Sequence, residues 1–263
     1  FGDTAMGYLS VTRGYKVGGF NISGTLPPEL REYDPETLWN YEAGLKGRWL
    51  EGRLGARAAV FTMRREDVQV DTSLTIERGD SGPVEFVELI SDAAEGTNTG
   101  LELEPDYRPV DALTLFASLG LMDTEFDDFV NNNGQDLDGE PQAHAPDYQF
   151  FAGAEYRIAP GWYVRVEAEG KDAFLINNSN RAVPGSGVDP DDVRTDAYTL
   201  WNASLGYEAR RFRVKLWGRN LGDEDYTVRG FYFGNDPRTG YAAEGWTQFG
   251  EPRRYGVTLT ITN

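Results

Sequence analysis

Cysteine is absent from this chain of 263 residues, and histidine occurs only once, at His144. The absence of cysteine excludes a disulfide scaffold, a thiolate metal site and a cysteine nucleophile, but it does not fix the compartment. A single histidine also excludes a histidine-based metal cluster and a Ser-His-Asp triad. We expect no enzyme, because a hydrolytic enzyme would lack a plausible nucleophile–base set, and no cofactor is predicted.

Basic residues are scarce, since 25 Lys and Arg stand against 43 Asp and Glu, giving a formal net charge of −18. This balance argues against nucleic acid as a partner, because binding phosphate backbones needs clustered Lys and Arg. No run of about 18 apolar residues occurs, so no transmembrane helix is expected. A transmembrane β-barrel would look the same by this measure, because only every second residue of its strands must be apolar.

Apolar and polar residues alternate with a period of two along most of the chain, which predicts β-strands. For example, Tyr41 and Leu45 fall on one face of a strand and Lys46 falls on the other. Similar alternation occurs in the segments 54–60, 113–121, 148–158, 162–171, 201–208, 212–217 and 255–261. We predict about ten strands, the two weaker ones near 5–15 and 97–107, and no sustained helical period.

The connections between these strands alternate in length. Short connections are predicted at 50–53, 106–112, 159–161 and 208–211, and long polar ones at 16–37, 71–96, 124–146, 173–196 and 226–252. Short turns at one end and long loops at the other are typical of outer-membrane barrels, whereas a soluble sandwich has short connections at both ends. Aromatic residues such as Trp39 and Trp49 bracket single strands, and ten tilted residues span roughly 24 Å, the height of a lipid-facing band.

Several segments also stand in an order that matches a known family. The chain closes with "LWGRNLGDEDYTVRGFYFG" and "GEPRRYGVTLTI", after "SVTRGYKVGGFN", "ETLWNYEAGLKGRWLEGRL", "AAVFTMRREDVQV", "NTGLELE", "LTLFASLGLMDTEFDDF" and "HAPDYQFFAGAEY". Together these resemble TonB-dependent receptors of the outer membrane over essentially the whole chain, although each motif is loose. The chain departs from the family's pattern at Gly222, where Phe is usual, and at Asn263, where an aromatic residue commonly ends the barrel.

The resemblance implies an all-β fold, an antiparallel transmembrane β-barrel of about 22 strands. Residues 1–263 are then the C-terminal portion, about ten strands, without the plug domain, the TonB-interacting box and the N-terminal strands. The chain also has no signal peptide and opens within a strand-like pattern, which indicates a mature or truncated piece. Ten strands would leave two unpaired edges, which are costly in hydrocarbon. They must therefore pair with missing strands of the same chain or of a partner chain.

By resemblance, the protein is an active transporter in the outer membrane of a Gram-negative bacterium. It takes up a scarce nutrient, most often a ferric siderophore, and the TonB complex displaces the plug. Lipid, lipopolysaccharide and the plug are then its other partners. Receptors for a saccharide or cobalamin, a passive porin, and a secreted all-β binding module are the alternatives.

The long loops contain aromatic and cationic residues that suit an aromatic or anionic chelate, or a sugar ring. The candidate ligand-binding residues are Phe174, Asn177, Arg181, Arg229, Phe231, Tyr232, Phe233, Arg238, Tyr241 and Trp246. The alternative is that these side chains form the loops' own core. On the charged face of the strands, we expect Arg48, Arg57, Arg165, Glu167, Glu169 and Arg219 to pair with each other or with a plug.

Two acidic segments allow a second interpretation. Residues 123–147 contain no Lys or Arg, and "NNNGQDLDGE" superficially resembles a calcium loop, but it lacks the spacing of an EF-hand. A solvated acidic loop is the better interpretation. The neighbouring carboxylates Asp223, Glu224 and Asp225 could in principle serve glycosidase chemistry, but we interpret them as solvated charge at a strand end.

Overall fold

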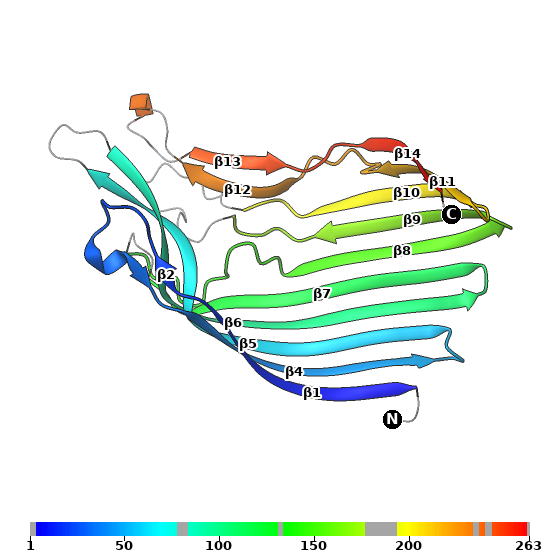
Figure 1. Cartoon of the computed structure of the whole chain (residues 1–263), viewed down its shortest axis with the longest axis horizontal. Coiled ribbons are helices and arrows are strands. Elements are labelled where there is room, and N and C mark those ends of the chain that lie inside the picture. The colour runs from blue at the N-terminus through cyan, green and yellow to red at the C-terminus, as the bar shows by residue number, and fades with distance from the viewer. Residues whose placement is uncertain are drawn as a thin grey trace.

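The structure, a computed structural model, describes residues 4–77, 84–130, 134–176, 194–233, 237–239 and 244–261. Ten strands form one antiparallel sheet in the order β1-β4-β5-β6-β7-β8-β9-β10-β11-β14 (Figure 1). They are β1 (Ala5–Lys16), β4 (Glu36–Trp49), β5 (Leu54–Glu77), β6 (Val84–Val110), β7 (Leu113–Asp128), β8 (Tyr148–Ala159), β9 (Trp162–Lys171), β10 (Tyr198–Glu208), β11 (Phe212–Arg219) and β14 (Arg254–Ile261). The predicted number of strands and the all-β fold are confirmed.

Two small hairpins lie outside this sheet. They are formed by β2 (Gly19–Phe20) with β3 (Glu32–Tyr33) and by β12 (Thr227–Phe233) with β13 (Glu244–Phe249). The helical elements of the described residues are the 3-10 turns Pro28–Leu30 and Pro237–Thr239. In this part of the chain, no helix is long and apolar enough to cross a membrane.

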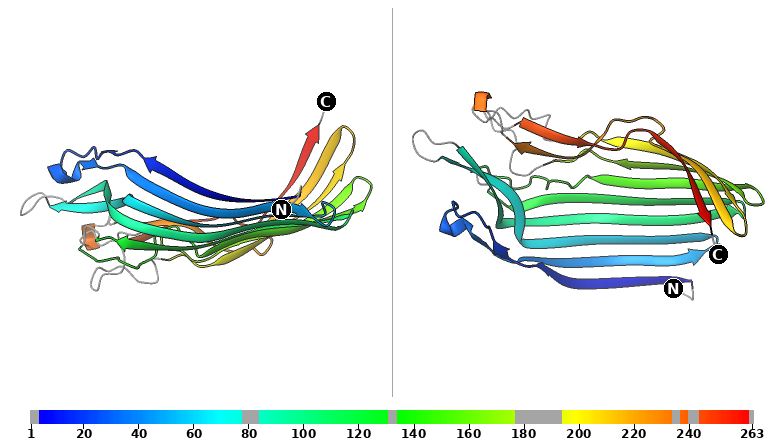
Figure 2. Two further views of the ribbon diagram at one scale, coloured as in Figure 1. Left: turned by 90° about the horizontal axis from the view of Figure 1, so that it is seen from below. Right: turned by 45° about the horizontal axis from the view of Figure 1, so that its top comes forward.

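The sheet bends into a trough, with short connections at one end and long ones at the other (Figures 1 and 2). We call the first the turn end, where β4–β5, β6–β7, β8–β9 and β10–β11 are joined, and the opposite one the loop end. Both ends of the described chain lie at the turn end (Figure 1). This is the alternation of connection lengths that the sequence predicts.

Two predicted connections are wrong, because the chain stays extended there. The predicted loop at 71–96 continues β5 and β6 as a long hairpin, with Asp71 opposite Ile90 and Glu77 opposite Val84. The predicted connection at 106–112 is strand as far as Val110. In both places the sequence is polar and resembles a loop, but pairing between strands satisfies the backbone amide groups. The predicted loop at 226–252 likewise contains the β12–β13 hairpin.

One face of the sheet is apolar from edge to edge, and we call it the apolar face. Cross-strand partners lie on the same face, and one row of partners runs Leu9, Ala43, Val60, Leu101, Leu121 and Tyr148. Leu9 is 87% exposed, and Val257 and Ile261 on β14 are also exposed. Apolar exposure on this scale indicates a surface that is covered by another apolar medium or partner.

Aromatic side chains of the apolar face gather near both strand ends. At the loop end Trp39 stacks on Tyr41, with ring centroids 6.5 Å apart. At the turn end Tyr207 lies between Trp162 and Phe212, at 5.0 and 6.0 Å. These positions agree with two aromatic belts.

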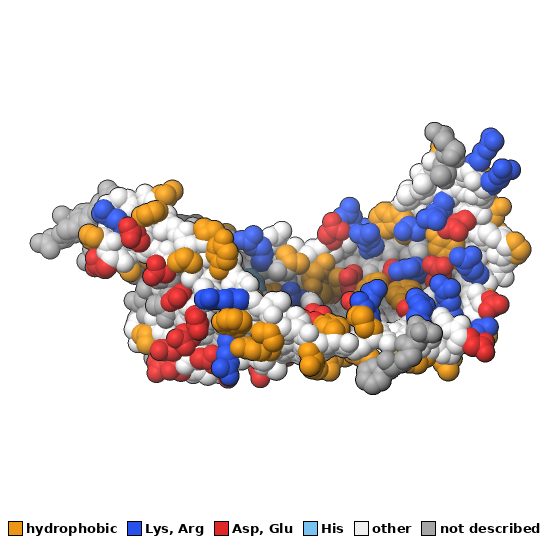
Figure 3. All heavy atoms as spheres, turned by 60° about the horizontal axis from the view of Figure 1, so that its bottom comes forward, with side chains coloured by type: hydrophobic (Ala, Val, Ile, Leu, Met, Phe, Trp, Pro, Cys, Tyr) orange, Lys and Arg blue, Asp and Glu red, His pale blue; other side chains and the backbone are white. Residues whose placement is uncertain are grey.

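The opposite face, which we call the polar face, carries charges of both signs. The molecule is hollowed on this side, and Lys, Arg, Asp and Glu side chains gather on the wall of the hollow (Figure 3). Ion pairs join Arg48 to Asp106 at 3.5 Å, Arg57 to Glu104 at 3.1 Å, Arg165 to Glu167 at 2.6 Å and Arg213 to Glu208 at 2.7 Å. Of the charges expected to pair with each other, Arg165 and Glu167 do so, whereas Arg48 and Arg57 pair with carboxylates outside that set.

The buried core lies at the loop end rather than behind the sheet. Its largest cluster contains Val68, Val70, Ala94, Phe126, Phe129 and Leu137, and a second contains Leu26, Val87 and Leu89. Because the sheet is a single layer, the loops supply the second layer that these side chains need. Burying each large apolar side chain contributes roughly 1.5–3 kcal/mol to holding the loop end together.

Candidate ligand-binding site

A hollow of about 400 Å³ lies on the polar face between β6 and β10. Its lining includes Glu102, Glu104, Ser118, Gln149, Phe151, Glu169, Lys171 and Tyr198. Glu169 accepts a hydrogen bond from Asn202 at 3.0 Å. Within the described part of the chain, Glu102 forms no hydrogen bond or ion pair. The floor of the hollow is thus acidic, and Lys171 supplies a cation at its loop end.

Phe174 lies directly beyond this hollow, and it is only 2% exposed. Lys171 Nζ lies 4.2 Å from the centroid of its ring, and the His144 ring lies 5.7 Å away. The backbone is fixed on both sides, because Thr195 N donates to Phe174 O at 2.9 Å and His144 N donates to Leu175 O at 2.8 Å. The ring of Phe174 is therefore a support for Lys171 and His144, with little surface left for a ligand.

The β12–β13 hairpin packs against the same segment. A Cβ atom on Gly230 would lie 2.7 Å from Ile176 Cδ1 and 3.0 Å from Trp246 O, so a larger residue here would require Ile176 to shift. Arg229 is exposed, and Trp246, which lies opposite Phe231 in the hairpin, is 43% exposed. The hairpin therefore presents a cation and an indole on a base that Ile176 holds in place.

The other predicted ligand-binding residues are described only in part or not at all. Phe231, Tyr232 and Phe233 belong to β12, but their side chains lie outside what the structure describes. Arg238 is exposed in the turn Pro237–Thr239. Asn177, Arg181 and Tyr241 lie outside the described residues. Ligand contact by this set remains a prediction.

Asn220 and Asp223 close the base of the hairpin, and the sequence pattern did not reveal this role. Asn220 is 3% exposed at a φ of 46°, and its amide donates to Glu224 O at 2.8 Å and to Glu251 O at 3.2 Å. Asp223 accepts from Arg253 N and Arg253 Nη2, both at 3.1 Å. Asp223 is exposed beyond the end of β11, as expected for solvated charge at a strand end, and its carboxylate also ties both ends of the long connection together.

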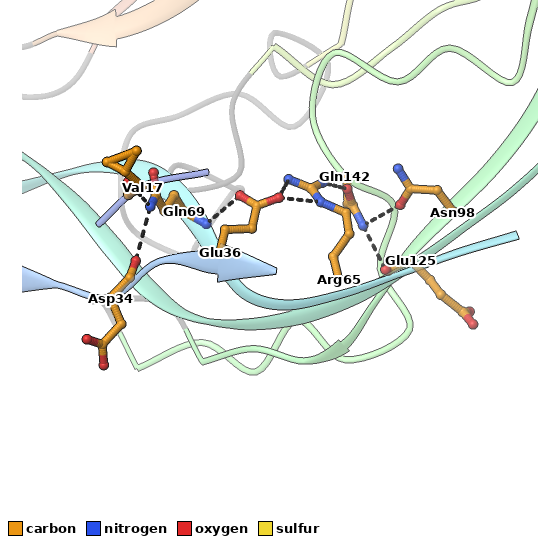
Figure 4. Close-up of polar contacts among 8 residues, drawn as sticks. All are labelled: Val17, Asp34, Glu36, Arg65, Gln69, Asn98, Glu125 and Gln142. Carbon is orange, nitrogen blue, oxygen red and sulfur yellow. Dashed lines mark hydrogen bonds and ion pairs between the residues drawn. The ribbon is translucent and has the colours of Figure 1, made fainter. Parts of the chain in front are cut away.

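A buried polar network joins the other loops at the loop end (Figure 4). Arg65 Nη2 lies 2.6 Å from Glu36 Oε1, and Arg65 Nη1 donates to Gln142 Oε1 at 2.8 Å. Gln142 Nε2 donates to Asn98 Oδ1 at 3.0 Å. Glu36 Oε2 also accepts from Gln69 N at 3.1 Å. Arg65 of β5 thereby links the start of β4 to the connection after β7, and Gln69 Nε2 adds the connection after β1 by donating to Val17 O at 2.9 Å and to Asp34 O at 3.1 Å.

The calcium interpretation of the acidic connection after β7 finds no support in the carboxylates that the structure describes there. Asp138 Oδ1 accepts from Phe129 N at 2.8 Å, and Asp136 Oδ1 accepts from Asp138 N at 3.1 Å. Among the described residues, no group of three or more His, Cys, Asp and Glu side chains is arranged to hold a metal ion. These carboxylates stabilise turns instead.

Acidification is expected to loosen the contact between His144 and Phe174. Burial of the ring lowers the pKa of His144, and the positive charges of Lys171 and Arg229 lower it further. Because the folded state then binds its proton less readily than the unfolded state, stability is full above the ordinary pKa of about 6.5. It falls as the pH drops from there to the lowered pKa. The amides of residues 143–147 and 174–176 should therefore lose protection from hydrogen exchange between pH 7.5 and 5, once the intrinsic pH dependence of exchange is corrected for.

The matched variant is His144→Phe, which keeps the aromatic contact and removes the titration. Its exchange at these residues should not change over the same pH range beyond the intrinsic chemical effect. An equal acceleration in both proteins would mean that another group is responsible.

A model of the family described as TonB dependent receptor-like, beta-barrel, matches residues 1–221. The chain belongs to this family. The pesticin receptor of Yersinia pestis is 24% identical over 230 residues, covering 87% of this chain and 30% of the receptor. The ferric-pyoverdine 358 receptor of Pseudomonas putida is 29% identical over 231 residues, covering 86% of this chain and 24% of that receptor. The chain thus spans less than a third of the length of these relatives.

Solved structures support the fold. The ferric yersiniabactin uptake receptor FyuA from Yersinia pestis superposes with a TM-score of 0.72 at 20% sequence identity, covering 98% of this chain and 35% of FyuA. The ten-stranded sheet is therefore part of a barrel of the TonB-dependent receptor type, as the resemblance implied.

Proposed function

We propose that the chain is the C-terminal portion of a TonB-dependent transporter that imports a metal chelate, in particular a ferric siderophore, across a Gram-negative outer membrane. The observation that carries this proposal is the curved sheet itself, apolar on one face and charged on the other, in a chain of this family. Relatives that are named as receptors for ferric pyoverdine and ferric yersiniabactin support the ligand class.

In this proposal the apolar face contacts lipid and the polar face lines the lumen. The turn end is periplasmic and the loop end is extracellular, since outer-membrane barrels keep short turns inside and long loops outside. Strands β1 and β14 are the two edges of the described sheet. Because open edges are not tolerated in hydrocarbon, the remaining strands of a barrel of about 22 pair with them.

The plug domain would occupy the lumen beside the polar face. Glu102, which has no partner among the described residues, is available to a cationic group of the plug. The TonB complex would act on the plug rather than on this chain. No bond is made or broken in this function, so the chain needs binding groups and no catalytic ones.

The ligand would bind at the loop end, over the hairpin that presents Arg229 and Trp246. An indole face and a guanidinium group suit a chelate that is aromatic or carries negative charge. Lys171 stands at the entrance of the acidic hollow beneath. The cationic groups at the mouth would attract such a ligand, while Glu102, Glu104 and Glu169 below would not hold it, which favours release toward the periplasm.

The test uses the complete protein in outer membranes and measures uptake of iron-55 chelates of the catecholate, phenolate and hydroxamate classes. We expect one class to be imported, only with TonB and a proton gradient. Trp246→Ala and Arg229→Gln should each weaken binding about 10- to 100-fold, as expected for losing about 1.4–2.8 kcal/mol at a central contact.

Arg210→Gln, at a turn between β10 and β11, is the matched control and should bind as the unaltered protein does. Uptake without TonB would identify a passive porin instead. Binding of cobalamin or a saccharide, with no iron chelate bound, would keep the transporter and change the ligand. A protein found in the soluble fraction would support the secreted binding module.

A further inference from the structure

The apolar face changes character abruptly at the loop end. Through the middle of the sheet its side chains are uncharged, as the row from Leu9 to Tyr148 illustrates. The outer row of the loop-end aromatic belt contains Arg13 opposite Trp39, and Trp39 opposite Arg64. Two arginines thus flank a tryptophan, side by side on three adjacent strands.

Neither arginine has an anionic partner within the described residues. Arg13 lies with its guanidinium carbon 5.5 Å from the centroid of the Trp39 ring. Arg64 forms no hydrogen bond or ion pair there, and Glu66, next on the same face, accepts instead from Thr37 Oγ1 at 3.2 Å. In a chain with an excess of 18 negative charges, the arginines of the polar face mostly find carboxylates, and these two do not.

The same row becomes acidic two strands further on. Arg64 lies opposite Thr97 of β6, and Thr97 lies opposite Glu125 of β7, whose neighbour on this face is Asp123. The positive patch is therefore confined to β1, β4 and β5. A general attraction of the loop end for anions does not explain such a confined patch.

We propose that Arg13, Trp39 and Arg64 form a docking surface for the phosphate headgroup of a lipid in the outer leaflet, namely lipopolysaccharide. Neighbouring strands are about 4.8 Å apart, so the Cα atoms of the two arginines are about 10 Å apart. One phosphate group can lie between their side chains, and guanidinium groups bind phosphate through paired hydrogen bonds. A hollow of about 340 Å³, lined by Arg13, Gly14, Tyr15, Pro35 and Thr37, adjoins the patch and leaves room for a headgroup.

The acyl chains of the same lipid continue along the apolar face. Val11 and Tyr41 follow Arg13 and Trp39 toward the middle of the sheet, and on β5 Arg64 is followed by Thr62 and then by Val60. Trp39 is 37% exposed at the boundary between the two environments, where indole rings are favoured. The arginines match the phosphate headgroup of such a lipid, and the apolar face matches its acyl chains. Free phosphate would contact only the arginines.

This inference rests on the proposed function, because it requires the apolar face to lie in an outer membrane. The protein is first extracted from membranes in mild detergent. Its bound lipids are then counted by native mass spectrometry, and its affinity for lipopolysaccharide is compared with that for the enzymatically dephosphorylated lipid. The variant pair is Arg13→Gln/Arg64→Gln against Arg210→Gln/Arg211→Gln, which removes the same charge at the turn end.

We expect the first pair to lower the affinity for phosphorylated lipid at least tenfold and the second to leave it unchanged. Dephosphorylated lipid should bind equally to all three proteins. Equal binding of phosphorylated lipid by the three proteins would overturn the inference but leave the transporter intact. If inorganic phosphate alone, at the same concentration, bound these arginines as well as the lipid does, the patch would be a phosphate site without a lipid. That result would also overturn the inference. A protein that remains soluble would overturn both proposals.

Discussion

Replacing Arg65 with methionine is expected to destabilise the loop end by about 3–5 kcal/mol, the usual cost of breaking a buried ion pair from one side. The pair is well shielded, with the side chains of Arg65 and Glu36 only 24% and 10% exposed. Without Arg65 the carboxylate of Glu36 keeps only the hydrogen bond from Gln69 N. Gln142 Oε1 also loses the donor that Arg65 provides. The ten-stranded sheet does not depend on these contacts and should stay assembled.

Hydrogen exchange is the measurement that separates local from global loss. Residues 17–35 and 134–147 should exchange faster in Arg65→Met, while the strands between the aromatic belts keep their protection. Arg57→Met is the control, because its pair with Glu104 is solvent-exposed at 75% and 52% and is worth at most about 1 kcal/mol. Global unfolding of Arg65→Met would contradict the assignment of this network to the loop end.

A second variant distinguishes the buried charge from the lost packing. In Glu36→Gln/Arg65→Met the carboxylate is gone together with its partner, so part of the lost stability should return. If the double variant is as unstable as Arg65→Met, the arginine acts through packing of its side chain. In either case the start of β4 and the connection after β7 are coupled, since Arg65 of β5 contacts both.

Alternation made the sheet predictable, because in the proposed orientation lipid and lumen impose opposite requirements on consecutive residues of each strand. Beyond the membrane this requirement ends. The hairpin extension at 71–96 therefore reads as a polar loop although it is paired strand. Two aromatic residues of one strand can also lie on different faces. Tyr198 lies opposite Lys171 on the polar face, and Trp201, three positions further along β10, lies opposite Ala168 on the apolar face.

The contacts of the candidate site could not be predicted from local pattern. Arg65 contacts Glu36 and Gln142 across 29 and 77 residues of sequence, and no periodicity contains such a pairing. Phe174 and Trp246 are both aromatic residues in polar segments, yet one is 2% and the other 43% exposed. Composition identifies a loop that is rich in rings and cations. Only the tertiary packing shows which rings are available to a ligand.

The proposed orientation of the two faces leads to the second large effect. Val60→Arg should destabilise the protein by about 2–4 kcal/mol, the cost of an arginine near the bilayer midplane on the lipid face of a barrel. Val60 is 51% exposed and lies opposite Ala43 and Leu101, midway between the aromatic belts. In lipid, the charged side chain would have no water and no counterion within reach.

The matched control moves the same arginine by one residue. Ala59 lies opposite Glu102, on the polar face, so Ala59→Arg places a cation beside a carboxylate that has no partner among the described residues. We expect its effect to stay within about 1 kcal/mol, as for most exposed ion pairs. Urea unfolding of the protein in phospholipid vesicles gives both values. A larger loss for Ala59→Arg than for Val60→Arg would reverse the faces, because a one-residue step in a strand exchanges lipid for lumen.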